Sequence, residues 1–169
     1  MRQRMVRVVQ QVLAALSTLT FALASVDAGA QVAATPRGAA ANLSDSQLQK
    51  LAKIAQDRGK EIQAFPQIVA ALGIPGSGNP IVTHQLATHD PDDNAVHHFF
   101  NVLPTGQGYL FGDVRAGTTR VFWVNNTLDV VAAVSNTSDP PVPVPIPMDA
   151  ARKAIVGELQ FWASIVDLL

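Results

Sequence analysis

Five short runs rich in β-branched and aromatic residues constrain the fold of this chain more than any other feature. Turn sequences separate these runs, among them PTGQG, RAG and Asn125-Asn126. Strands joined by turns of a few residues pair with their neighbours in the sequence, so the pattern predicts an antiparallel meander of four to five strands. The predicted strands lie at 81–88, 96–103, 109–114, 118–124 and 128–135.

The segment before these strands carries the signals of helices. Ser44 suits an N-cap position, and Gln47 three residues later completes a capping box. Apolar residues then recur at helical spacing as far as Phe65, and Pro66 ends or kinks the helix because proline lacks a backbone donor. Pro66 also suits the first turn of a second helix, which Gly73 would end. We therefore expect two helices that share one apolar stripe.

A proline-rich stretch and a last helix follow the strands. The stretch between 140 and 147 holds five prolines, which predict an extended, polyproline-like crossing. Asp149 then suits the N-cap of a helix that gathers apolar residues on one side. The whole pattern predicts an α+β fold: N-terminal helices, a four- to five-stranded antiparallel β-meander, a proline-rich crossing and a C-terminal helix packed on the sheet.

The first thirty residues have the three-part layout of a secretory signal peptide. Arg2, Arg4 and Arg7 give a positive start, and a mostly apolar stretch follows from 13 to 24. The small residues of 28–30 then suit a signal peptidase. We expect cleavage after this last segment and export of the remaining chain.

The predicted organisation is a signal peptide over 1–30, a disordered leader over 31–42 and a single α+β domain over 43–169. A membrane-spanning helix needs about 20 predominantly apolar residues, so the shorter signal core predicts no stable membrane insertion after cleavage. The chain has no cysteine, which leaves its stability to an ordinary hydrophobic core. We expect a periplasmic or secreted protein.

The charge of the chain gives little support to nucleic-acid binding. Removal of residues 1–30 takes away three of the twelve basic residues and one of the thirteen acidic ones, which leaves a net charge of about −3. A protein that binds nucleic acid needs a basic patch to neutralise phosphates. Nucleic acid is therefore not an expected partner.

All four histidines lie in one stretch, THQLATHDPDDNAVHH, at residues 83–98. Imidazole is a good ligand for zinc and copper, and the two flanking runs are predicted to pair as a hairpin. Side chains alternate along a strand, so His97 and His98 face opposite ways and only one of them shares a face with His84. The candidate metal ligands are His84, His89, His98 and Asp90.

The same stretch supports two other interpretations. Its Asp-Pro-Asp-Asp-Asn segment is an ordinary turn composition, in which short side chains bond nearby backbone amides. His98 with Asp90 or Asp92 would instead form the acid–base pair of a small hydrolase. The sequence offers no obvious nucleophile or oxyanion hole beside that pair, and the absence of cysteine excludes thiol catalysis.

The last helix holds a candidate contact with a partner. Phe161 and Leu168 fall near the border of its polar side, seven residues apart. Together these features favour an exported, non-catalytic binding or interaction module of the cell envelope, with an unknown protein or small molecule as its partner. The sheet would offer an edge strand or an open face. A transition-metal-binding protein is the alternative, and a small hydrolase the second alternative.

Overall fold

The computed structural model describes residues 43–76, 78–137 and 142–169 of the chain. The predicted signal peptide, 1–30, and the predicted leader, 31–42, lie outside the described residues. Within the described part, three α-helices accompany a seven-stranded antiparallel open sheet, so the fold is mixed α+β. No helix in this part is long and apolar enough to cross a membrane.

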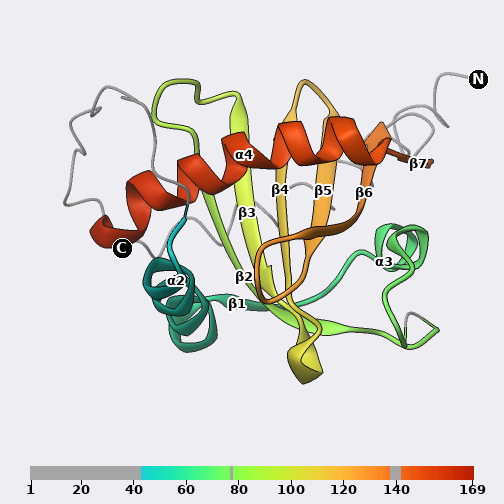
Figure 1. The fold of residues 1–169 in the computed structure, drawn as a ribbon, viewed down its shortest axis with the longest axis horizontal. Coiled ribbons are helices and arrows are strands. Elements are labelled where there is room, and N and C mark those ends of the chain that lie inside the picture. The colour runs from blue at the N-terminus through green and yellow to red at the C-terminus, as the bar shows by residue number, and fades with distance from the viewer. Residues whose placement is uncertain (1–42, 77, 138–141) are drawn as a thin grey trace, which may run out of the picture. The chain divides into compact units, whose positions relative to one another are not determined.

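The sheet is an uninterrupted meander in the order β1 to β7 (Figure 1). It has seven strands rather than four to five, because β1 and β7 add one strand at each edge of the five predicted runs. The helices are α2 (Asp45–Arg58), α3 (Pro66–Leu72) and α4 (Met148–Ile165), with 3₁₀ turns η2 (Pro104–Gly106) and η3 (Val166–Leu168). The strands are β1 (Lys60–Gln63), β2 (Val82–His89), β3 (Val96–Val102), β4 (Tyr109–Arg115), β5 (Thr118–Val124), β6 (Val130–Thr137) and β7 (Pro143–Pro145).

Strand β1 lies where the sequence predicted the first helix to continue. The helix ends at Arg58, and Gly59 caps it with extended backbone at φ −66° and ψ 155°. A Cβ atom on Gly59 would overlap the carbonyl oxygen of Ala55 and lie 3.0 Å from that of Gln85 in β2. A residue without a side chain therefore lets the chain leave the helix against β2 and add an edge strand.

Strand β7 lies within the stretch that was predicted to be a polyproline-like crossing, of which residues 140 and 141 lie outside the described residues. The backbone amide of Ile146 donates to the carbonyl of Ala133 in β6 at 2.9 Å. Hydrogen-bonded and non-hydrogen-bonded pairs alternate along an antiparallel ladder. Pro143 and Pro145 therefore occupy outward-facing positions of an edge strand, where a missing N–H removes no ladder bond.

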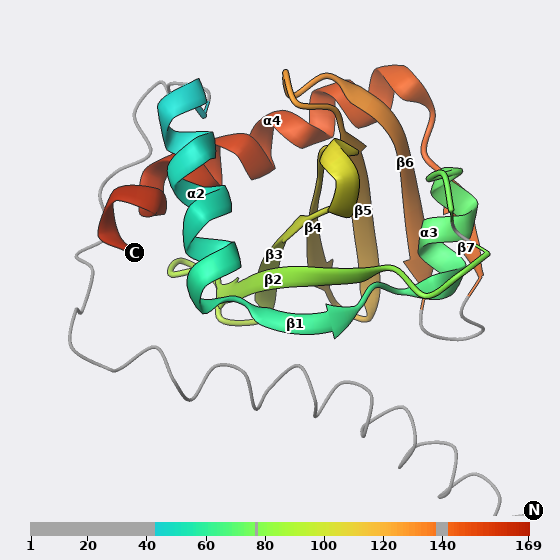
Figure 2. The ribbon, with the colours of Figure 1, turned by 90° about the horizontal axis from the view of Figure 1, so that it is seen from below.

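Each face of the sheet has its own apolar core. Helices α2 and α4 cover one face, and α3 covers the other. Figures 1 and 2 show α4 lying across the strands, with α2 beside its C-terminal part. Under these two helices, a row of paired phenylalanines from β3, β4 and β5 is fully buried: Phe100, Phe111 and Phe122.

Candidate functional site

The structure places the four histidines in three different surroundings. Register pairs His84 with Val102 at one end of the β2–β3 hairpin and His89 with His97 at the other. His98 lies four positions along β3 from Val102, a distance of about 13 Å at the rise of a strand. The structure therefore does not bring the candidate ligands His84, His89 and His98 together. In the described ranges, no group of three or more His, Cys, Asp or Glu side chains is placed to hold a metal ion.

His98 forms a buried triad with two carboxylates, which we call the His98 triad: Asp90, His98 and Glu158. Its Nδ1 lies 2.9 Å from Oε2 of Glu158, and its Nε2 lies 3.2 Å from Oδ2 of Asp90. The three residues are 4%, 6% and 2% exposed in chain order. A carboxylate only accepts, so this geometry suits an imidazolium ring that donates from both nitrogens. The triad thereby joins the β2–β3 loop and β3 to α4.

Phe161 covers the His98 triad and is not part of a surface patch. Its ring stacks on that of His98, with centroids 3.7 Å apart and an angle of 17° between the planes. Phe161 is 1% exposed, whereas Leu168 is 55% exposed. The predicted contact pair is therefore wrong for Phe161, because α4 turns this side of its surface onto the sheet.

The surroundings of His98 favour its charged form. Burial lowers the pKa of His98, but the hydrogen bonds and negative charges of Glu158 and then Asp90 outweigh burial, so the pKa is raised above 6.5. The register neighbour of His98 on β4 is Asp113, which is itself buried and receives two hydrogen bonds from Arg120. The His98 imidazolium therefore lies between two carboxylates, those of Glu158 and Asp90.

We expect the free energy of unfolding to fall as the pH rises from about 6.5 through the raised pKa of His98. The folded triad holds its proton more tightly than the unfolded chain does. Its stabilising effect is therefore complete below the ordinary histidine pKa and is lost above the folded-state pKa. Urea unfolding between about pH 6 and pH 9, in a chelating buffer, measures this slope. An equal slope in the His98→Gln variant, which lacks the titrating ring, would contradict the assignment.

The triad contains the acid–base pair that the sequence suggested. His98 and Asp90 are in contact, while the backbone amide of Asp92 donates to Oδ1 of Asp90 at 2.9 Å. The side chains of His98, Asp90 and Glu158 are at most 7% exposed. A hydrolase that used this pair would have to uncover all three side chains first. In this structure the triad is an ion cluster that holds α4 against the sheet.

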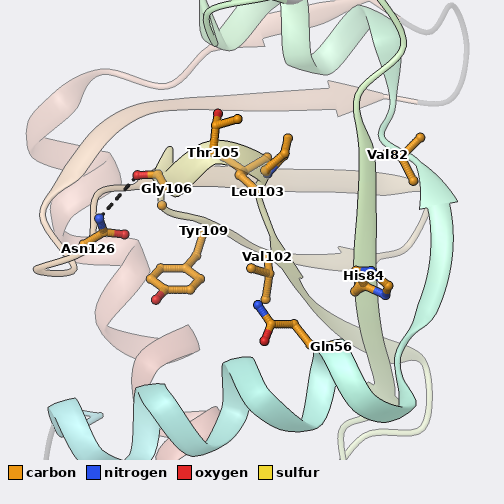
Figure 3. Close-up of a pocket in the computed structure, with 11 residues that line it drawn as sticks. Gln56, Val82, His84, Val102, Leu103, Thr105, Gly106, Tyr109 and Asn126 are labelled. Carbon is orange, nitrogen blue, oxygen red and sulfur yellow. Dashed lines mark hydrogen bonds between the residues drawn. The ribbon is translucent and has the colours of Figure 1, made fainter.

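A cavity of about 460 Å³ lies at the other end of the same sheet face (Figure 3). It is bounded by the last turn of α2, the open end of the β2–β3 hairpin, η2 and the β5–β6 loop. Figure 3 shows Gln56 and Val102 between Tyr109 on one side and His84 on the other. The described lining residues are Gln56, Val82, His84, Val102, Leu103, Pro104, Thr105, Gly106, Gly108, Tyr109 and Asn126.

Two loops form the rim of this pocket; they are hydrogen-bonded to each other, and one of them is also hydrogen-bonded to β5. Nδ2 of Asn126 donates to the carbonyl of Gly106 at 3.3 Å. Nε1 of Trp123 donates to the carbonyl of Gln107 at 2.8 Å. Thr105 has a φ of 57°, which is unusual for a β-branched residue. Strained backbone of this kind is concentrated at sites that hold ligands, so its position on the rim is notable.

Sequence reasoning identified only His84 among the residues of this pocket, and it assigned that residue to a metal. Nδ1 of His84 is buried and makes no hydrogen bond within the described part of the chain. The PTGQG and Asn125-Asn126 segments were identified as turns, which is correct. These two loops meet at one end of the sheet because of the lengths of the strands between them. The spacing of the glycines alone does not predict that contact.

Comparisons with known proteins identify no relative of this chain. No protein-family model matches it, and neither a curated protein nor a solved structure does so. The function therefore has to be argued from the pocket and its chemistry.

Proposed function

We propose that this protein is an exported binding module of the cell envelope, periplasmic or secreted, which holds a small uncharged ligand in the pocket beside His84. The N-terminal layout of the sequence supports export. The observation that carries the binding role is the cavity itself. A volume of about 460 Å³ lies within the range of small-molecule sites.

The lining favours a neutral ligand. None of the described lining side chains is Asp, Glu, Lys or Arg. A charged group buried without a partner of opposite charge loses far more solvation than a neutral group does. An anion or a cation would therefore bind more weakly than an uncharged molecule of the same shape.

The pocket also offers separate contacts for apolar and polar parts of a ligand. Val82, Val102 and Leu103 give apolar surface, and Tyr109 adds an aromatic ring. The side chains of Gln56 and Thr105 also line the pocket, and an amide or a hydroxyl group can donate to a ligand hydroxyl or accept from it. The expected ligand therefore combines an apolar body with a hydroxyl or amide group.

Three probes of similar shape test this proposal: benzyl alcohol, benzoate and benzylamine. We expect benzyl alcohol to bind with a roughly millimolar Kd and to shift the amide NMR signals of Thr105, Gly106 and Gly108. The two charged probes should shift these signals much less at equal concentration, because the described lining offers them no counter-charge. Selective binding of a charged probe would contradict the neutral-ligand assignment.

A variant that fills the pocket locates the binding. Val82 is 50% exposed at the mouth, so Val82→Trp can block the pocket without disturbing the core. Val131, on β6, is 41% exposed and is not among the lining residues, so Val131→Trp is the matched control. We expect loss of benzyl alcohol binding in the first variant only. Equal binding by both variants would show that the probe binds elsewhere.

A further inference from the structure

His89 and His97 form a pair on the sheet face opposite the His98 triad. They are register partners near the turn of the β2–β3 hairpin. The amide of Asp90 donates to the carbonyl of Val96 at 2.8 Å, which makes that neighbouring pair the hydrogen-bonded one. His89 and His97 are therefore a non-hydrogen-bonded pair, the kind in which side chains approach most closely. Their ring centroids lie 4.0 Å apart.

The orientation of His89 is fixed by the backbone of the turn. Its Nδ1 lies 3.1 Å from the carbonyl oxygen of Asn94. A carbonyl oxygen only accepts, so Nδ1 carries a hydrogen, and in a neutral ring the lone pair is then on Nε2. Histidines that bind metals are commonly held in this way, with one ring nitrogen donating to a carbonyl and the other facing the ion.

A neutral imidazole ring has a lone pair that can bind a metal ion, whereas a protonated ring has none. Both rings are half-buried rather than sealed, so the pair is open to solutes.

We propose that His89 and His97 together bind a divalent transition-metal ion, zinc or copper, on this face of the hairpin. Two imidazole nitrogens are suitable ligands for either ion. No third His, Cys, Asp or Glu within the described ranges completes the set, so water fills the remaining positions. The bound ion would therefore exchange with solution, unlike the ion of a structural metal site. The site is separate from the pocket beside His84, and it replaces the ligand set that the sequence suggested.

Titration of the full-length chain, expressed without an affinity tag, with Zn²⁺ alone tests the site by calorimetry. We expect one ion per chain, and a loss of affinity of roughly tenfold or more in His97→Ala and in His89→Ala. His84→Ala is the matched control, because it removes a histidine from the other end of the hairpin and should leave the affinity unchanged. No binding to the wild type, or an equal loss in the control, would overturn the proposal.

A second measurement keeps the test valid if an alanine variant does not fold. Substoichiometric Cu²⁺ broadens NMR signals of nearby nuclei, because the ion is paramagnetic. We expect the amide signals of His89 and His97 in the wild type to broaden first, before those of His84. The His97→Gln variant should lose this broadening while it keeps the dispersed spectrum of a folded protein. Broadening that begins at His84 would place the ion elsewhere and reject the pair.

Discussion

Replacement of Glu158 by alanine is expected to lower the free energy of unfolding by about 3 to 5 kcal/mol. Glu158 is 2% exposed and faces Nδ1 of His98, so the substitution leaves a buried ring nitrogen without its acceptor. It also leaves His98 with only Asp90 to offset the cost of burying its charge. A loss of this size is a large part of the total stability of a small domain, which is about 5 to 15 kcal/mol. Urea unfolding measures it directly.

Two comparisons show whether this loss arises from the buried charges. Asp57→Ala breaks an exposed ion pair with Lys53 and should cost at most about 0.5 kcal/mol. The triple variant Asp90→Asn, His98→Phe, Glu158→Leu removes all three charges, keeps an Oδ1 acceptor for the amide of Asp92 and keeps an aromatic ring against Phe161. It should recover most of the loss, because well-packed uncharged side chains often equal a buried ion cluster. If Glu158→Ala costs no more than Asp57→Ala, the triad is not buried in solution.

Replacement of Trp162 by alanine is expected to cost about 3 to 5 kcal/mol as well, for a different reason. Trp162 is 1% exposed and packs against Phe100 and Phe161, with ring centroids 6.0 and 5.4 Å away. Truncation leaves a cavity between α4 and the sheet that the strands cannot close. Thermal and urea unfolding of the variant both report this loss.

Trp162→Phe is the matched control for this prediction. Nε1 of Trp162 is buried and has no hydrogen-bond partner within the described ranges, so the change to phenylalanine gives up no hydrogen bond seen there. It keeps the ring contacts with Phe100 and Phe161 and should cost much less than the alanine substitution. A phenylalanine variant as unstable as the alanine variant would show that the indole nitrogen has a partner in solution.

The sequence predicted the middle of the sheet well, because local signals decide it. The segments of β2 to β6 are rich in β-branched and aromatic residues and are separated by short turns, and each strand pairs with its neighbour in the chain. The edge strands were missed because tertiary contacts decide them. Ile62 continues the helical spacing of α2, yet Gly59 turns the chain into β1. The prolines of β7 disfavour an inner strand but are compatible with an outer one.

The site was harder to predict because its residues come from distant parts of the chain. His98 and Glu158 are sixty residues apart in sequence and meet only when α4 lies on the sheet. A local signal for this contact does exist. Glu158 lies three residues after Ile155 and four before Trp162, so it lies on the apolar stripe of its helix. An acidic residue at such a position indicates a buried partner of opposite charge.

The prolines of β7 have a consequence for how this protein behaves when it is concentrated. An exposed sheet edge can take up a strand of another molecule and begin the stacking that leads to fibrils. At Pro143 and Pro145 the outward positions of β7 have no amide hydrogen to offer an incoming strand. The opposite edge, β1, is four residues long and carries Lys60 and Glu61. Both edge strands therefore disfavour pairing with a strand of another molecule. Concentrated chains can lie close together without forming an intermolecular sheet.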